Sequence, residues 1–339
     1  MGRHAASLPC GAMRPGRRSL SLVIPMVALA AWAAGATGIG AGAGLRALAG
    51  ARTGATGSSG PTGPRGPRRP PSRAPQTERF TLHSAMLHRA LGEIVVIPGG
   101  TPPPSPRPLL VLLHGRGASP AGWLSDEFFR GLAKLGPRAP DVLLANGGDH
   151  SYFHDRADGP WGSSVMQEAI PAALRRTGAD PRRMAVGGIS MGGFGAFDLA
   201  RLHPGTFCAV GGHSAALWER FADSAPGAFD DSGDFARHDV IAAVRRHPTL
   251  YGRARIWLDG GNDDPFRSAD EALAAALRTP YGPVSVMHWP GGHDGSYWHA
   301  HVARYLAFYG NALAGGGCRR PGSAQPPTPR PRPRRAPPR

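Results

Sequence analysis

Residues 183–204 read RMAVGGISMGGFGAFDLARLHP, and their pattern sets the architecture expected of the whole chain. The part up to Ile189 is apolar enough for a buried strand, and residues 193–202 carry a helical pattern. Between them, Gly188 and Gly192 flank Ser190 in a G-x-S-x-G pentapeptide, where side chains larger than hydrogen would clash on a tight turn. The segment therefore predicts a strand, a sharp turn that presents Ser190, and a helix whose first N–H groups point at that turn. The alternative is a glycine-rich turn in which Ser190 only caps the helix.

Apolar runs and helical patterns alternate through residues 80–314 on both sides of this segment. The expected strands are 80–87, 93–97, 109–114, 142–145, 184–189, 207–212, 255–258 and 284–289. The expected helices are 123–135, 165–176, 193–202, 268–277 and 297–313, with a polar, irregular stretch up to about residue 252. Such alternation predicts an α/β fold with a mostly parallel, eight-stranded sheet that helices cover on both faces. Chemistry in such sheets lies at the carboxyl ends of the strands.

A serine hydroxyl becomes a good nucleophile only when a base removes its proton, and the chain offers 14 histidines for this role. His293 lies in the glycine-rich loop Pro-Gly-Gly-His-Asp after the last expected strand, at the carboxyl edge of the sheet. We therefore expect His293 to be the base. Structural or surface roles are expected for His114, His203, His288, His299 and His301.

An acid that orients the base is expected after the preceding strand, where residues 257–266 read WLDGGNDDPF. Asp264 is favoured, because it lies beyond the strand end and has the reach to turn toward His293. Asp263 and Asp259 remain alternatives, with Asp259 better placed to cap the strand end. The resulting order of serine, acid and histidine along the chain is that of the α/β-hydrolase triad.

The oxyanion of an acyl-transfer reaction needs N–H donors beside the serine. The backbone N–H of Met191 is one candidate, and the loop His-Gly-Arg-Gly at residues 114–117 supplies another, most favourably from Arg116. An ordinary turn between a strand and a helix is the alternative interpretation of this loop.

At these motifs the sequence resembles the esterase family of α/β-hydrolases that contains esterase D, also called S-formylglutathione hydrolase, and the mycobacterial antigen 85 mycolyltransferases. The similar stretches are LLVLLHGRG (109–117), ANGGDHSYFHDRADGPWG (145–162), RMAVGGISMGGFGAFDLARLHPGTFCAVGGHSAAL (183–217), WLDGGNDDPF (257–266) and GGHDGSYW (291–298). The resemblance implies an α/β-hydrolase fold with Ser190 as nucleophile, Asp264 as acid and His293 as base. It also implies that Trp161 and the segment from Asp155 to residue 159 line the approach to the site.

The sequence departs from the mycolyltransferases in two respects. Their acid is a glutamate, whereas this chain offers aspartates, and no long insertion suited to a very long acyl chain is visible. The expected activity is therefore that of a serine esterase that hydrolyses small-molecule or lipid esters through an acyl-enzyme. A cell-envelope acyltransferase with a sugar acceptor is the close alternative, and a non-catalytic cell-wall-binding protein on a hydrolase scaffold is the alternative of another class.

Substrate selection is assigned to residues 215–252, where Trp218 and three phenylalanines either cap the pocket or pack a surface subdomain.

The three cysteines show neither a C-x-x-C motif nor metal-ligand spacing. We therefore expect no metal and no organic cofactor.

The formal net charge of +16 lies at the two ends of the chain. Residues 1–79 carry +10 and residues 315–339 carry +7, whereas residues 80–314 carry −1, so a nucleic-acid-binding domain is excluded by composition.

Residues 1–36, with a basic start and an apolar run, predict an export signal peptide or an N-terminal membrane anchor. Residues 37–79 and 315–339 are expected to be disordered, solvated spacers. Contact of their arginines with the cell wall or a membrane surface is the alternative interpretation. Residues 80–314 are then a catalytic domain outside the cytoplasm.

Overall fold

The computed structural model describes residues 74–100, 103 and 105–315. The predicted export segment, most of the predicted linker 37–79 and nearly all of the predicted tail 315–339 lie outside the described residues. Of the helices in the described part of the chain, none combines the length and the apolar character that a membrane span requires.

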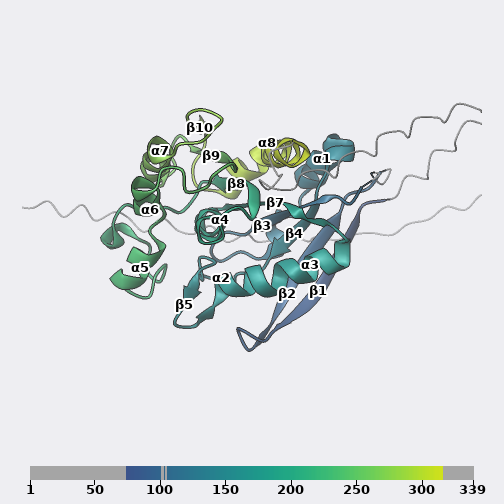
Figure 1. Cartoon of the computed structure of the whole chain (residues 1–339), viewed down its shortest axis with the longest axis horizontal. Coiled ribbons are helices and arrows are strands. Elements are labelled where there is room, and N and C mark those ends of the chain that lie inside the picture. The colour runs from purple at the N-terminus through teal and green to yellow at the C-terminus, as the bar shows by residue number, and fades with distance from the viewer. Residues whose placement is uncertain (1–73, 101–102, 104, 316–339) are drawn as a thin grey trace, which may run out of the picture. The chain divides into compact units, whose positions relative to one another are not determined.

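An eight-stranded sheet with the order β1-β2-β4-β3-β7-β8-β9-β10 forms the centre of the fold (Figure 1). Its strands are β1 Gln76–Ser84, β2 Arg89–Ile97, β3 Pro108–Leu113, β4 Asp141–Ala145, β7 Asp180–Ile189, β8 Phe207–His213, β9 Arg255–Gly261 and β10 Val286–Trp289. The strands from β4 to β10 in this order are parallel to one another, and β1 and β2 pair antiparallel at one edge. The predicted mostly parallel, eight-stranded sheet is therefore confirmed.

Helices cover both faces of this sheet. They are α1 Asp126–Leu135, α2 Trp161–Ser164, α3 Ile170–Thr177, α4 Met191–Leu202, α5 Ser232–His238, α6 Val240–Arg246, α7 Arg267–Ala276 and α8 Gly295–Ala314. Side chains of β3 alternate between the faces: Leu110 and Leu112 pack in the same apolar cluster as α1 and α8, whereas Val111 packs with α3, α4, α6 and α7. In Figure 1, α1 and α8 lie together on one side of the sheet and α2, α3 and α4 on the other.

Several boundaries differ from those expected by up to four residues, and two of these differences have a clear physical reason. The first strand begins at Gln76 rather than at residue 80, because Gln76 to Arg79 pair with β2 although their polar side chains show no apolar alternation. The helix expected at 165–176 begins already at Trp161 as α2 and passes through a π-helical turn, Val165–Ala169, into α3. Pro171 near the start of α3 has no N–H for the regular α-helical bond, which accounts for the irregular turn.

The stretch expected to be irregular up to residue 252 contains helices α5 and α6 and a 3-10 turn, Phe221–Asp223. Each helix has an aspartate at its N-cap: Asp231 accepts a hydrogen bond from the N–H of Asp234, and Asp239 accepts one from the N–H of Ala242. Helices of seven residues are too short to show a clear apolar period, which is why the sequence did not reveal them.

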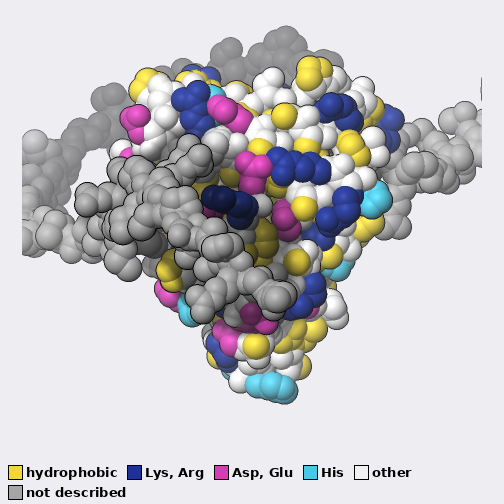
Figure 2. Space-filling view, turned by 90° about the vertical axis from the view of Figure 1, so that its left-hand side faces the viewer, with side chains coloured by type: hydrophobic (Ala, Val, Ile, Leu, Met, Phe, Trp, Pro, Cys, Tyr) yellow, Lys and Arg dark blue, Asp and Glu magenta, His cyan; other side chains and the backbone are white. Residues whose placement is uncertain are grey.

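Figure 2 shows the surface at the end of the molecule that carries α5 and α6. Over the atoms that are not grey, arginine and acidic side chains are interspersed, and hydrophobic side chains lie among them. This mixture agrees with the near-zero net charge of residues 80–314.

Glu93 of β2 is a carboxyl group that folding removes almost completely from water. Burial raises its pKa to about 8, although the N–H of Asn146 donates a hydrogen bond to Oε2 at 3.0 Å and opposes this rise. The folded state thus holds a proton that the unfolded chain releases near pH 4.5, so Glu93 makes the protein less stable as the pH rises from about 4.5 to about 8.

Glu93→Gln should remove this loss. The free energy of unfolding of the wild type should fall from pH 5 to pH 9 by roughly 3–5 kcal/mol more than that of the variant. Urea denaturation at both pH values measures this difference. Glu78→Gln, which changes an exposed glutamate of β1, is the control, and an equal pH dependence in all three proteins would contradict the prediction.

Candidate active site

Ser190 lies at the turn between β7 and α4, in a backbone conformation that few residues adopt. Its φ is 53° and its ψ is −115°, and its N–H donates a hydrogen bond to the carbonyl of His213 at 3.0 Å. A Cβ atom on Gly188 would lie 2.3 Å from the carbonyl carbon of Gly192, and one on Gly192 would lie 2.3 Å from the carbonyl oxygen of Leu113. The two glycines therefore permit the turn, and the strained turn holds the serine side chain out at the end of the strand.

Ser190, His293 and Asp264 form one chain of hydrogen bonds. Nε2 of His293 lies 2.8 Å from Oγ of Ser190, and Nδ1 lies 3.1 Å from Oδ2 of Asp264. His293 comes from the loop between β10 and α8, and Asp264 comes from the loop after β9. The carboxyl ends of β7, β9 and β10 thus bring together three residues that lie up to 103 positions apart in the sequence.

The electrostatics of Asp264 fit the task of orienting an imidazole. Burial opposes its charged form, but the hydrogen bond and charge of His293, the N–H of Phe266 and the hydroxyl of Ser214 together hold the pKa of Asp264 below its ordinary value. An ionised carboxylate only accepts hydrogen bonds, so Nδ1 of His293 carries the proton. Nε2 is then free to accept the hydroxyl proton of Ser190.

The other two aspartates considered for the acid lie elsewhere. Asp263 is exposed, and only its backbone N–H bonds across to the carbonyl of Gly291. Asp259 is fully buried in β9, where its carboxylate binds a group of side chains beneath the site. These are the hydroxyls of Tyr297 at 3.0 Å and Tyr305 at 2.9 Å, the indole N–H of Trp257 at 2.6 Å and Nδ1 of His213 at 2.7 Å.

His114, at the end of β3, fixes the loop that is expected to hold the oxyanion. Burial lowers its pKa to about 4, so the ring is neutral. Its Nδ1–H donates to the carbonyl of Gly115 at 2.9 Å, and its Nε2 accepts the N–H of Gly147 at 3.1 Å. The imidazole therefore ties the loop after β3 to the loop after β4.

The two expected oxyanion donors lie on either side of Ser190. Met191 is the first residue of α4, where a backbone N–H has no acceptor within the helix. On the other side, a Cβ atom on Gly115 would lie only 3.6 Å from Cβ of Ser190, so the backbone that leads to Arg116 passes close to the serine. The guanidinium of Arg116 donates to the carbonyl of Pro226 at 2.9 Å, which links this loop to the segment before α5.

Of the three expected substrate contacts, Trp218 is connected to His293 through one intervening ring. Its ring packs edge to face with Phe266 at 5.4 Å between centroids, and Phe266 packs in the same way against His293 at 5.0 Å. Trp218 and Phe266 are both half-buried, so these rings form one partly open aromatic wall beside the imidazole.

Trp161 and Asp155 have their contacts away from this wall. The Trp161 ring is buried against Leu87 and Leu91 of the β1–β2 hairpin, and its Nε1–H donates to Asp158 at 3.1 Å. The Asp155 carboxylate accepts hydrogen bonds from the backbone N–H and the hydroxyl of Ser163. Their expected role at the approach to the site stays a prediction.

Sequence reasoning missed two aromatic neighbours of His293. Phe266 flanks the imidazole on one side, and Trp298 of α8 lies edge to face with it at 5.1 Å. The indole N–H of Trp298 also donates to Oγ of Ser214, next to the acid. Both residues stand within five positions of a predicted triad member, and this proximity was the available indication.

Comparison with solved structures identifies the fold. A ferulic acid esterase is 22% identical with a TM-score of 0.61, over 71% of this chain and 99% of that one. An S-formylglutathione hydrolase from Agrobacterium tumefaciens is 18% identical with a TM-score of 0.56, over 71% and 96%. MPT51 of Mycobacterium tuberculosis is 16% identical with a TM-score of 0.54, over 70% and 99%. The predicted α/β-hydrolase fold is thereby confirmed.

The sequence itself places the chain among known families. No curated protein matches it significantly. Residues 84–309, which are more than half of the chain, match the family described as Putative esterase. The resemblance inferred from the motifs is therefore confirmed, and the chain belongs to the Putative esterase family of α/β-hydrolases.

Proposed function

We propose that the chain is an exported serine esterase that hydrolyses carboxylic esters with Ser190, His293 and Asp264. The observation that carries this proposal is the bridging imidazole, which lies 2.8 Å from the serine hydroxyl and 3.1 Å from the buried carboxylate. Membership of an esterase family supports hydrolase activity, and it leaves the substrate to be determined by the site.

In the first half of the proposed reaction, Oγ of Ser190 attacks the ester carbonyl carbon while Nε2 of His293 takes the hydroxyl proton. The charge that develops on the carbonyl oxygen is stabilised by the backbone N–H groups of Met191 and Arg116. The bond to the alcohol oxygen then breaks, and His293 returns its proton to the leaving alcohol. The acyl group remains attached to Ser190.

In the second half, water attacks the acyl-enzyme and gives a proton to His293, and the acid leaves as Ser190 regains its hydrogen. The half-buried rings of Trp218 and Phe266 offer apolar surface next to His293, which suits the acyl group or the alcohol of a small-molecule or lipid ester. Transfer of the acyl group to a sugar hydroxyl would share every step up to the acyl-enzyme.

A burst assay with p-nitrophenyl esters of increasing acyl length tests the proposal. The full chain should release one equivalent of p-nitrophenol rapidly and then turn over slowly, and Ser190→Ala should show no burst. Trehalose or glucose as acceptor should leave the turnover rate unchanged. Faster turnover with an acylated sugar as product would favour transfer over hydrolysis, and the absence of a burst in folded wild-type protein would contradict the nucleophile.

Export is the part of the proposal that rests on residues 1–36. Sequencing the N-terminus of the chain recovered outside the producing cells tests it. A new N-terminus after residue 33 or 36 would support a cleaved signal peptide, whereas retention of the full N-terminus in the membrane fraction would support an anchor.

A further inference from the structure

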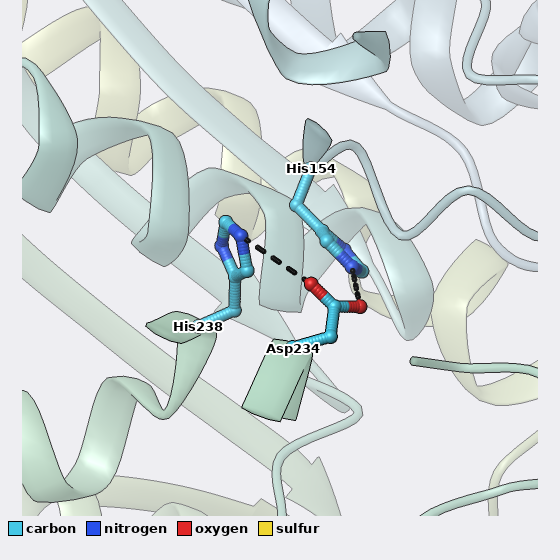
Figure 3. Close-up of side chains that lie close together, drawn as sticks. All are labelled: His154, Asp234 and His238. Carbon is cyan, nitrogen blue, oxygen red and sulfur yellow. Dashed lines mark hydrogen bonds and ion pairs between the residues drawn. The ribbon is translucent and has the colours of Figure 1, made fainter. Parts of the chain in front are cut away.

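Three side chains that the proposed reaction does not use lie together on the side of α4 away from the sheet. His154 comes from the loop between β4 and β5, a two-residue strand at Asp155–Arg156, whereas Asp234 and His238 are one turn apart on α5. All three are buried (Figure 3). The two imidazole rings face the Asp234 carboxylate from either side, so one nitrogen of each ring and the carboxylate converge on a common point.

The distances in this cluster are compatible with three ligands of one metal ion, although the Asp234 carboxylate also accepts hydrogen bonds from His154 and from the N–H of Asp230. Nε2 of His154 lies 3.1 Å from Oδ2 of Asp234, and Nε2 of His238 lies 3.8 Å from Oδ1. The second distance is too long for a hydrogen bond. Bonds of about 2.0–2.1 Å in a tetrahedral zinc site place neighbouring ligand atoms roughly 3.3 Å apart, which falls between the two distances.

A second carboxylate holds His238 in the orientation that a metal requires. Nδ1 of His238 lies 2.8 Å from Oδ2 of Asp198, a fully buried residue of α4. Arg201 pairs with the other oxygen of the same carboxylate at 2.6 Å. A histidine whose Nδ1–H is bound to a carboxylate presents Nε2 to the metal, and this arrangement is typical of zinc ligands.

We propose that His154 Nε2, His238 Nε2 and the carboxylate of Asp234 bind one zinc ion, with a water molecule as fourth ligand. Two imidazoles and one carboxylate suit zinc, whereas calcium and magnesium prefer oxygen ligands alone. Arg237 now donates to Oδ1 of Asp234 at 3.1 Å, but its side chain is 66% exposed and can turn to solvent when the cation enters.

The bound ion would connect α5 to the loop after β4, and through Asp198 to the helix that follows the nucleophile. Its role would be to stabilise this corner of the fold, because the ligands belong to none of the triad loops. The site stands on its own observations and does not depend on the proposed esterase activity. It also differs from the expectation of a metal-free protein. His154 lies 80 residues before Asp234, so the sequence does not show that it joins the pair Asp234 and His238, which are four residues apart.

Zinc binding to the tag-free, metal-stripped full chain tests the proposal. After incubation with zinc and desalting, elemental analysis should find one zinc per chain. With free zinc at 100 times its Kd, Tm should rise by about 5–10 °C. Asp234→Asn and His154→Gln should each weaken binding at least 100-fold, whereas His247→Gln, which changes an exposed histidine after α6, should bind as the wild type does.

Cobalt provides a readout that needs no variant. Tetrahedral Co²⁺ bound to the wild type should give intense visible absorption bands that an equivalent of zinc removes. A wild-type chain that retains no zinc, shows no rise in Tm and gives no such bands would overturn the proposal, and a hydrogen-bonded cluster would then be the correct description. Binding that survives in folded Asp234→Asn and His154→Gln would equally overturn the assignment.

Discussion

Ser190→Ala should lower kcat for a p-nitrophenyl ester by about 10⁴–10⁶-fold, because it removes the only atom that can form the acyl-enzyme in the proposed reaction. The activity that remains should come from the N–H groups of Met191 and Arg116, which still stabilise the oxyanion when water attacks directly. Initial rates and the burst amplitude measure the loss. Alanine and serine share the same Cβ at the strained φ of 53°, so Tm should change little.

Ser268→Ala is the matched control, since Ser268 is exposed on α7. It should keep wild-type kcat within a factor of two. If Ser190→Ala kept activity within tenfold of the wild type, in protein free of contaminating esterase, another residue would have to be the nucleophile.

Asp264→Asn should lower kcat by about 10³–10⁴-fold while leaving the fold intact. The asparagine amide would donate a hydrogen bond to Nδ1 of His293, and Nε2 would then carry the ring proton. In this tautomer the imidazole cannot accept the proton of Ser190. Steady-state kinetics near neutral pH measures the effect, with KM expected to change much less than kcat.

Asp263→Asn provides the control for the neighbouring carboxylate. Asp263 is exposed, and the carboxylate that bonds to Nδ1 of His293 is that of Asp264, so kcat of Asp263→Asn should stay within twofold of the wild type. A large loss in Asp263→Asn together with normal activity in Asp264→Asn would reverse the assignment of the acid.

The elements that the sequence predicted well are those specified by short stretches of chain. Six apolar residues fix β3 as a strand buried on both faces, and the two glycines around Ser190 permit a turn that larger side chains would block. The position of His293 followed from its glycine-rich loop at the carboxyl edge of the sheet. The choice between Asp264 and Asp263 could not be settled in this way, because it depends on how the loop after β9 bonds to Gly291, almost 30 residues further along.

Contacts between distant segments account for what the sequence did not reveal. Helix α5 is stabilised by its packing and by capping rather than by a long apolar period, and the cluster of His154, Asp234 and His238 forms only when α5 meets a loop 80 residues earlier. The two rings beside His293 are likewise chosen by tertiary packing. Apart from the short sequence distance of Phe266 and Trp298 from the predicted triad members and the four-residue interval between Asp234 and His238, no spacing in the sequence indicates these contacts.

The buried imidazole of His114 has a consequence for how reaction rates depend on pH. Because burial keeps this ring uncharged down to a pH of about 4, its two hydrogen bonds, to Gly115 and from Gly147, persist over the whole range in which esters are usually assayed. The loop that carries the Arg116 N–H should therefore keep one shape from mildly acidic to alkaline solution. A change of rate within that range would then report the protons of the reacting groups themselves, and not a movement of the scaffold around them.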